Sequence, residues 1–396
     1  MPRAVRYGVL IPATLAALLL AAAPALERAA LAALILLDLQ AGAAPSRLKE
    51  RTAPPLRTAA DFTLDGRHLP ADRYLPADRP AVATLVLLHG LTPAGRREPR
   101  LARFAQTLAR AGFTVLVPEL PGMKSLAVGT EDVRDIGAAL RHALDGRPDP
   151  CHAVGELAVS FAVGPALIAA LEPGIRDGLA FVVAVGGYHD LGAAITYATT
   201  GFDPLAGHRG TPPAAEGRWW LLQSQTERLS DPEDRALLIA LARRRLADPD
   251  AAVGDLTDRL GPEGRALHAL AANRDPQRVP GLIAALPEAV RRQLEALDLA
   301  RRDLSPLRAR LLLIHGTGDT AIPASHSRAL RARLGGDRAL LFEADGLQHV
   351  DVAPGLADAW QLWRAIDQLL KTAGRPAPDC RAPATASSHS LGLPAR

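Results

Sequence analysis

The sequence predicts an α/β fold: a mostly parallel sheet covered by helices, with a helical cap inserted into it and an apolar N-terminal segment. Continuous apolar runs alternate with segments whose apolar residues have helical spacing, and this alternation is typical of α/β proteins. The runs lack polar alternation, as expected of strands buried on both faces of a parallel sheet. The pattern stops at residue 191 and resumes after residue 305, which indicates an inserted helical unit rather than a loop.

The apolar runs set the expected boundaries along the chain. A hairpin with an Asp65-Gly66 turn comes first. The expected core strands then cover residues 83–88, 113–117, 155–159, 180–185, 310–315 and 339–342. The chain therefore divides into an N-terminal segment (1–40), a linker rich in Pro, Ala and Arg (41–58), a first core part (59–190), the cap (191–305), a second core part (306–373) and a disordered tail (374–396).

The N-terminal segment contains two apolar runs, residues 8–23 and 29–37, of which the first carries no charge. A signal peptide cleaved at Ala23-Pro24-Ala25, a single anchor and a short helical hairpin are three possible readings. Cleavage would leave the second run exposed at the start of a soluble protein, which favours aggregation. We therefore expect residues 8–37 to hold the chain on a membrane of the bacterial inner-membrane type, with the side of the remaining chain left open.

Composition excludes several classes of partner. The 396 residues are 48% hydrophobic and 22% charged, as in globular proteins, and the net charge of +4 comes from arginines scattered among acids. Such scatter predicts a solvated surface and no nucleic-acid partner. Two cysteines are too few for a metal cluster or a disulfide framework. Because Cys380 lies in a Pro/Ala/Ser-rich tail, we expect no bridge to Cys151.

Ser160 occupies the expected turn between an apolar strand and a helix. Small residues, Ala158 and Ala162, stand two positions away on either side, where larger side chains would collide. A serine in such a turn has the placement of the nucleophile in the G-x-S-x-G elbow. Here alanine replaces both glycines, and Glu156 interrupts the apolar strand.

Two further polar residues, Asp319 and His349, follow expected strands. The carboxyl ends of parallel strands meet at one edge of a sheet, where active sites of open sheets lie. A hydroxyl nucleophile needs a base, and the base needs a partner that fixes its tautomer. We therefore expect Ser160 as nucleophile, His349 as base and Asp319 as the group that orients it, with Asp190 as the alternative orienting group.

The tetrahedral oxyanion of such a reaction needs hydrogen-bond donors. The backbone N–H groups of Phe161 and Leu91 are the expected pair. We interpret His89 as a structural residue that stabilises the loop presenting Leu91. Arg96 and Arg97 are interpreted as solvated, and Trp219 and Trp220 as packing residues of the cap, with substrate contact as the alternative.

Together these motifs resemble those of the α/β-hydrolase fold family of serine hydrolases, which includes esterases, lipases and related peptidases. LVLLHG at residues 85–90, the Ser160 turn, LLLIHGTGD at residues 311–319 and His349 carry the resemblance, which covers about residues 62–370. The most specific motif is the apolar strand that ends in His-Gly-x-x-Asp, with Pro323 shortly after it.

The resemblance implies a carboxylesterase-like Ser-His-Asp hydrolase that acts on an ester, thioester or amide bond of a small acyl substrate, without metal or cofactor. A peptidase or an acyltransferase on the same triad is an alternative. A non-catalytic binding or scaffold protein is another, and the altered Ser160 turn is its main support. The sequence indicates neither the substrate nor the oligomeric state.

Overall fold

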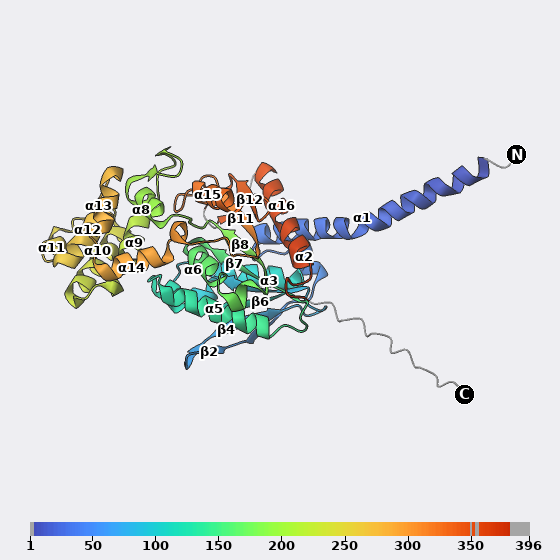
Figure 1. Cartoon of the computed structure of the whole chain (residues 1–396), viewed down its shortest axis with the longest axis horizontal. Coiled ribbons are helices and arrows are strands. Elements are labelled where there is room, and N and C mark those ends of the chain that lie inside the picture. The colour runs from blue at the N-terminus through green and yellow to red at the C-terminus, as the bar shows by residue number, and fades with distance from the viewer. Residues whose placement is uncertain (1–3, 349–350, 353–355, 381–396) are drawn as a thin grey trace, which may run out of the picture.

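A central sheet of eight strands organises the structure (Figure 1). The computed structural model describes the backbone of residues 4–348, 351–352 and 356–380, and the side chains of residues 22–347 and 358–380. The strands are β1 (Leu56–Ala59), β4 (Ala71–Leu75), β5 (Ala83–Leu88), β6 (Phe113–Pro118), β7 (Ala153–Val159), β8 (Leu179–Val185), β11 (Arg310–Gly316) and β12 (Ala339–Ala344).

Their order in the sheet is β1-β4-β6-β5-β7-β8-β11-β12. β4 pairs antiparallel with both β1 and β6, and the other neighbouring pairs are parallel. The predicted α/β fold with a mostly parallel sheet is therefore confirmed.

Helices cover both faces of this sheet. One face carries α5 (Thr130–Asp145), α6 (Val163–Ala169) and α15 (Ser325–Leu334). The other carries α3 (Pro99–Arg110), α16 (Leu356–Ala373) and the second half of α1 (Ala4–Ala41). In β7, Val154 and Ala158 join the first apolar cluster, whereas Ala153 and Leu157 join the second. Because alternate residues point to opposite faces, a strand buried on both needs a continuous apolar run.

The segment between β8 and β11 is mainly helical and gathers at one end of the molecule (Figure 1). Asp231 caps one of its helices by accepting a hydrogen bond from the Glu233 amide at 2.8 Å, with Pro232 in the first turn. The helices are α8 (Leu191–Thr200), α9 (Gly217–Gln225), α10 (Pro232–Ala247), α11 (Gly254–Thr257), α12 (Pro262–Ala272), α13 (Val279–Ala284) and α14 (Glu288–Leu297); the short strands β9 (Phe202–Asp203) and β10 (His208–Arg209) pair beside them.

The predicted hairpin around Asp65 and Gly66 is present. β2 (Phe62–Leu64) and β3 (Arg67–Leu69) flank Asp65 and Gly66, whose φ angles of 49° and 77° are those of a tight hairpin turn. The second strand ends before Pro70, which cannot donate to a ladder. The chain then enters β4 of the main sheet.

The predicted linker at residues 41–58 is wrong. Arg47–Arg51 form the short helix α2, whose N-terminus is capped by the Ser46 hydroxyl, and Leu56–Ala59 form the edge strand β1. The preceding prolines suggested irregular structure, but an edge strand tolerates proline near its start.

The second apolar run, residues 29–37, packs on the domain and is not a lipid-facing segment. Ala32 and Ile35 of α1 are fully buried, and α1 packs against α3 and α16. Arg28 pairs with Asp367 of α16 at 2.8 Å. The expectation that residues 8–37 lie together in a membrane is therefore wrong for residues 29–37. The apolar side chains of this run pack on the helices that cover the sheet.

The side chains of the first run, up to residue 21, lie outside the described residues. Across the parts of the chain that are described, no helix combines the length and the hydropathy that a membrane crossing requires.

A disulfide joins Cys151 and Cys380, contrary to expectation, with Cα atoms 4.5 Å apart. The Ala377 amide donates to the Cys151 carbonyl at 2.9 Å, and Arg147 pairs with Asp379 at 2.9 Å. Residues 374–380 of the predicted disordered tail therefore lie on the domain, and residues 381–396 are outside the described part. The bridge spans 229 residues of sequence, so only tertiary packing brings its two ends together.

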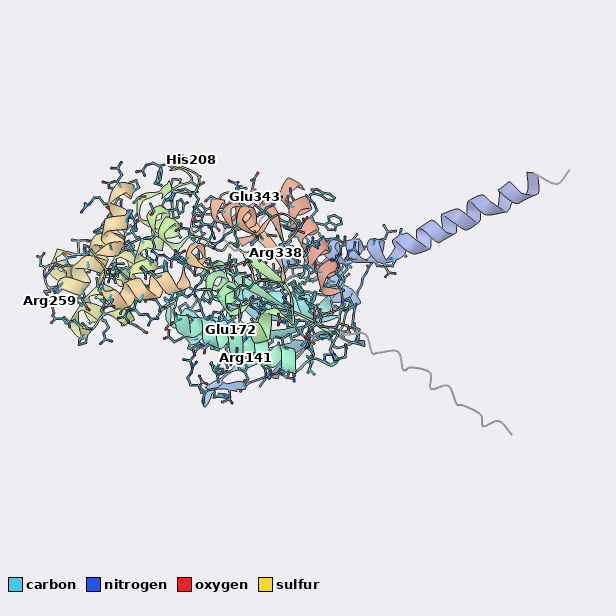
Figure 2. The ribbon with its side chains drawn as sticks, viewed as in Figure 1. Arg141, Glu172, His208, Arg259, Arg338 and Glu343 are labelled. Atoms are coloured by element: carbon cyan, nitrogen blue, oxygen red, sulfur yellow. A yellow bond between two sulfur atoms is a disulfide. The ribbon has the colours of Figure 1, made fainter. Side chains whose placement is uncertain are left out.

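Charged side chains are distributed over the surface (Figure 2), and several form ion pairs. Arg141 of α5 pairs with Glu172 at 2.5 Å, and Arg259 pairs with Glu233 at 2.9 Å in the cap. Exposed pairs of this kind contribute little to stability individually.

Candidate active site

Ser160 follows β7 directly and starts a helical turn, Ser160–Ala162, that continues into α6. Its φ angle is 58°, in the left-handed region that costs a residue other than glycine about 1–2 kcal/mol. Val159 before it is extended (φ −117°, ψ 135°), and Ala162 after it is helical (φ −68°, ψ −19°). The strain of the turn therefore falls on Ser160 itself, and backbone strain of this kind is concentrated at functional sites.

Glycine is needed further along the helix rather than at the two alanines. Ala158 and Ala162 are fully buried and fit. A Cβ on Gly164, in contrast, would lie 1.8 Å from the Tyr188 hydroxyl oxygen. That hydroxyl donates to the Leu297 carbonyl at 3.0 Å, so Gly164 allows Tyr188 to connect the Ser160 helix with the cap.

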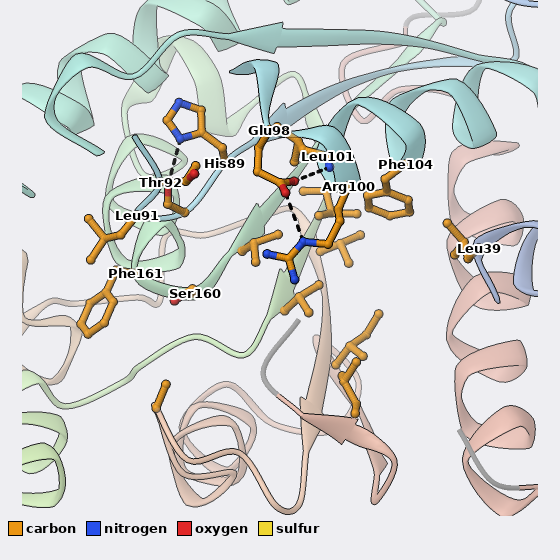
Figure 3. Close-up of a pocket in the computed structure, with 18 of the residues that line it drawn as sticks. Leu39, His89, Leu91, Thr92, Glu98, Arg100, Leu101, Phe104, Ser160 and Phe161 are labelled. Carbon is orange, nitrogen blue, oxygen red and sulfur yellow. Dashed lines mark hydrogen bonds and ion pairs between the residues drawn. The ribbon is translucent and has the colours of Figure 1, made fainter. Parts of the chain in front are cut away.

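The loop after β5 lies against the Ser160 turn. A Cβ on Gly90 would be 3.3 Å from the Ser160 Cβ, tighter than nearly all such contacts. The Leu120 amide donates to His89 Nε2 at 3.1 Å, so the ring proton sits on Nδ1, which donates to the Gly90 carbonyl at 2.8 Å (Figure 3). His89 therefore holds the loop that carries Leu91, in agreement with the structural role expected for it.

A buried ion-pair group anchors the same loop. Arg96 bonds Glu119 at 2.8 Å and lies 3.2 Å from Asp72, so the prediction of a solvated arginine is wrong. Burial alone would raise the pKa of the Glu119 carboxyl, but hydrogen bonds from the Arg96 amide and from Lys124 lower it to about 2. No sequence pattern identifies this group, because its members come from separate strands and loops.

Asp319 follows β11, and its side chain is completely buried. One carboxyl oxygen accepts hydrogen bonds from the amides of Ala321 and Ile322, at 2.8 and 3.0 Å. His315 Nε2 lies 3.6 Å from the other oxygen and is bonded to the Ile322 carbonyl at 2.8 Å. The loop is thus fixed around a carboxylate with one defined orientation.

The sheet brings the ends carrying Ser160 and Asp319 close together. β7 and β11 both pair with β8, so their carboxyl ends lie about 10 Å apart, two strand spacings. Asp190, the alternative orienting group, caps α8 by accepting from the Ala193 amide at 2.8 Å.

His349 lies outside the described residues. The chain leading to it is described: β13 (Leu347–Gln348) pairs with β14 (Asp351–Val352), and a Cβ on Gly316 would lie 1.7 Å from the Leu347 carbonyl oxygen. Leu347 also lines the same cavity as Ser160. The segment before His349 therefore reaches the end of β11, next to the loop of Asp319.

Ser160 lines a cavity of about 760 Å³, together with Leu91 and Phe161 (Figure 3). The sheet contributes an aliphatic floor, and α1, α3, α16 and the cap supply the walls. Trp220 of the cap lines the cavity, whereas Trp219 is buried beside Arg245. The floor consists of Leu157, Val159, Val183, Val185 and Ile314. In the described part of the chain, no group of His, Cys, Asp or Glu side chains is placed to hold a metal.

No protein-family model and no curated protein sequence matches the chain. Solved structures do resemble it. A Pyrococcus horikoshii acylaminoacyl peptidase aligns at 13% identity and a TM-score of 0.44, covering 81% of this chain and 42% of that one. A Pyrococcus furiosus esterase aligns at 14% identity and a TM-score of 0.45, covering 80% of this chain and 91% of that one. A dienelactone hydrolase from Anabaena variabilis aligns at 18% identity and a TM-score of 0.40, covering 80% of this chain and 96% of that one.

The chain spans less than half the length of the acylaminoacyl peptidases, and likenesses this distant establish no activity for it. The assignment of the fold rests on the chain's own geometry. Its sheet is parallel except for β4 and the edge strand β1, and a strained serine turn joins β7 to the following helix. With this strand order and this turn, the chain has the α/β-hydrolase fold.

Proposed function

We propose that the chain is a serine hydrolase that cleaves carboxylic esters through an acyl-enzyme, with Ser160 as nucleophile, His349 as base and Asp319 as the group that orients His349. The observation that carries the proposal is the φ angle of 58° at Ser160, on the wall of a large cavity. A scaffold protein without catalytic function has no reason to keep a strained serine there, since glycine would occupy the same turn without strain.

In the proposed reaction, His349 accepts the Ser160 hydroxyl proton while Oγ attacks the ester carbonyl carbon. The carbonyl oxygen becomes an oxyanion that receives hydrogen bonds from the Phe161 and Leu91 amides. As the tetrahedral intermediate collapses, the ester C–O bond breaks and His349 returns the proton to the departing alcohol. Water then attacks the acyl-enzyme by the same route, releasing the acid and the free serine.

The aliphatic floor of the cavity supports an ester with an apolar acyl group over a peptide substrate. Peptide recognition requires polar groups that pair with the backbone of the substrate, whereas the floor under Ser160 carries only Leu, Val and Ile side chains. Thioesters share the same acyl geometry and fit the same proposal.

Hydrolysis of p-nitrophenyl butanoate by the wild type and by Ser160→Ala tests this function. The variant should lose at least a thousandfold in kcat with an unchanged melting temperature, because only the nucleophilic oxygen is removed. Ser230→Ala, at an exposed serine of the cap, is the matched control and should keep full turnover. Equal turnover by Ser160→Ala and the wild type would contradict the assignment.

We propose further that residues 8–23 attach the chain to a membrane. α1 is one continuous helix whose N-terminal part extends away from the domain (Figure 1). Trp360, which is 57% exposed, stacks on Trp363, and Trp363 donates to the Ala29 carbonyl of α1 at 2.9 Å. An exposed tryptophan beside a departing apolar helix suits a membrane interface.

The disulfide supports an oxidising compartment for the catalytic domain. Fractionation with N-terminal sequencing tests the attachment. A membrane-bound chain that begins at Met1 or Pro2 is the expected result. A soluble chain that begins near Leu26 would contradict it, because cleavage there removes residues 8–23 and leaves the part of α1 that packs on the domain.

A further inference from the structure

We propose that the acyl group cleaved by this enzyme is a long unbranched aliphatic chain of about ten carbons or more, and that helix α1 forms one wall of its binding site. The inference rests on the hydrolase function proposed above. It assigns a substrate-binding role to a helix that is remote from Ser160 in sequence.

The cavity continues far beyond the space that a short acyl group needs. In Figure 3, Ser160 and Phe161 lie on one side of it and Leu39 of α1 on the other, with lining side chains between them. At about 760 Å³, the volume is in the upper part of the range for small-molecule pockets, roughly 300–1,000 Å³. The side chains on the far side are mainly aliphatic and come from three helices: Ile35, Leu36, Leu39, Leu101, Leu108, Leu362, Ile366 and Leu369.

Three of the charged residues that line this space, Glu98, Arg100 and Asp38, are engaged by protein groups. Glu98 accepts from the Leu101 amide at 2.7 Å and pairs with Arg100 at 3.1 Å. Asp38 accepts from the Thr107 hydroxyl and from Ser46. A ligand chain in the cavity would thus meet apolar surface, and every methylene that it buries contributes about 0.8 kcal/mol, a fourfold gain.

Two sets of contacts hold α1 against the domain, where it forms one wall of the cavity. At one end, Arg28 and the Ala29 carbonyl bond to α16. At the other, Asp38 bonds α3 through Thr107 at 2.5 Å and pairs with Lys49 at 3.1 Å. Burial would raise the pKa of Asp38, but its hydrogen bonds with Ser46, Thr107 and Lys49 hold the pKa below the usual value. The carboxylate therefore stays charged and keeps the end of α1 in place.

The test compares hydrolysis of p-nitrophenyl esters from acetate to hexadecanoate by the wild type, Leu39→Trp and Leu37→Trp. For the wild type, kcat/KM should rise severalfold per added methylene between butanoate and decanoate. Leu39→Trp fills the far side of the cavity and should lower the dodecanoate-to-butanoate ratio of kcat/KM at least tenfold. Leu37, which is 53% exposed on the same helix, provides the matched control, and its tryptophan variant should keep the wild-type ratio.

If a melting curve shows that Leu39→Trp does not fold, Leu39→Ala serves as the second variant. By enlarging the cavity, this variant should move the preferred chain length upward. A wild-type kcat/KM that is flat or falls beyond butanoate would overturn the inference and leave the hydrolase function standing. An unchanged ratio in both Leu39 variants would overturn the role of α1. Absence of turnover on every ester, without labelling of Ser160 by a fluorophosphonate, would overturn the proposed function and this inference with it.

Discussion

Gly90 lies directly against Ser160: a Cβ added to Gly90 would be 3.3 Å from the Ser160 Cβ and 3.1 Å from the Val159 carbonyl oxygen. Gly90→Ala should therefore shift the loop of Leu91 by a few tenths of an ångström. Because the Leu91 amide is the proposed oxyanion donor, kcat for ester hydrolysis should fall at least tenfold while KM changes little. Gly174→Ala, where an added Cβ meets nothing within 4 Å, is the control and should behave as the wild type.

Asp319 and Asp190 both follow strands, and matched substitutions separate their roles. Asp319→Asn can still accept from the amides of Ala321 and Ile322, so the loop should keep its shape. It loses the charge that stabilises a protonated base, and kcat should fall by about 10³–10⁴. Asp190→Asn replaces one good helix cap by another and should leave kcat within about twofold. A large loss in Asp190→Asn with a small one in Asp319→Asn would reverse the assignment.

The sheet and the Ser160 turn could be predicted because their signals are local. Apolar runs identify buried strands, and a serine between two alanines identifies a tight turn. The strain of the turn has no such local signal: Ala162 is relaxed, and the left-handed residue is Ser160.

What the sequence could not show depends on tertiary partners. Residues 29–37 have the composition of a lipid-facing segment, and only the presence of α3 and α16 shows that they cover a domain. The same holds for Arg96, whose partner Glu119 follows a different strand, and for the bridge from Cys151 to Cys380.

The Glu156 carboxyl lies buried in the centre of the sheet, where it lowers the stability of the fold. It is fully buried in β7, and neither carboxyl oxygen has a hydrogen-bond partner among the described residues. Burial raises the pKa of Glu156 well above its usual 4.5, so the folded chain holds the proton more tightly than the unfolded chain. The stability that this proton provides is fully present below the unfolded pKa and is lost as pH rises towards the folded pKa.

Glu156→Met should therefore raise the melting temperature, and its advantage over the wild type should grow between about pH 5 and about pH 8. Differential scanning fluorimetry across this range measures the effect. A gain that stays constant from about pH 5 to about pH 8 would show that the carboxyl is ionised in the folded state.

The bridge between Cys151 and Cys380 should stabilise the domain. Cys380→Ser should lower the free energy of unfolding in urea by about 2–4 kcal/mol, because the unfolded chain loses a cross-link. Cys151→Ser and the double variant should match it, since each removes the same bond. Thiol titration of the unfolded wild type without reductant should detect no free cysteine, and two free thiols per chain would show that the bridge does not form.

Fluorophosphonate labelling with peptide mapping shows whether Ser160 is an activated nucleophile. The reagent forms a phosphonyl ester only with a serine activated by a neighbouring base. We expect one adduct per chain, on the peptide that contains Ser160, and no adduct in a folded Ser160→Ala variant. A folded wild-type chain that remains unlabelled, or that is labelled at another serine, would show that Ser160 is not the nucleophile.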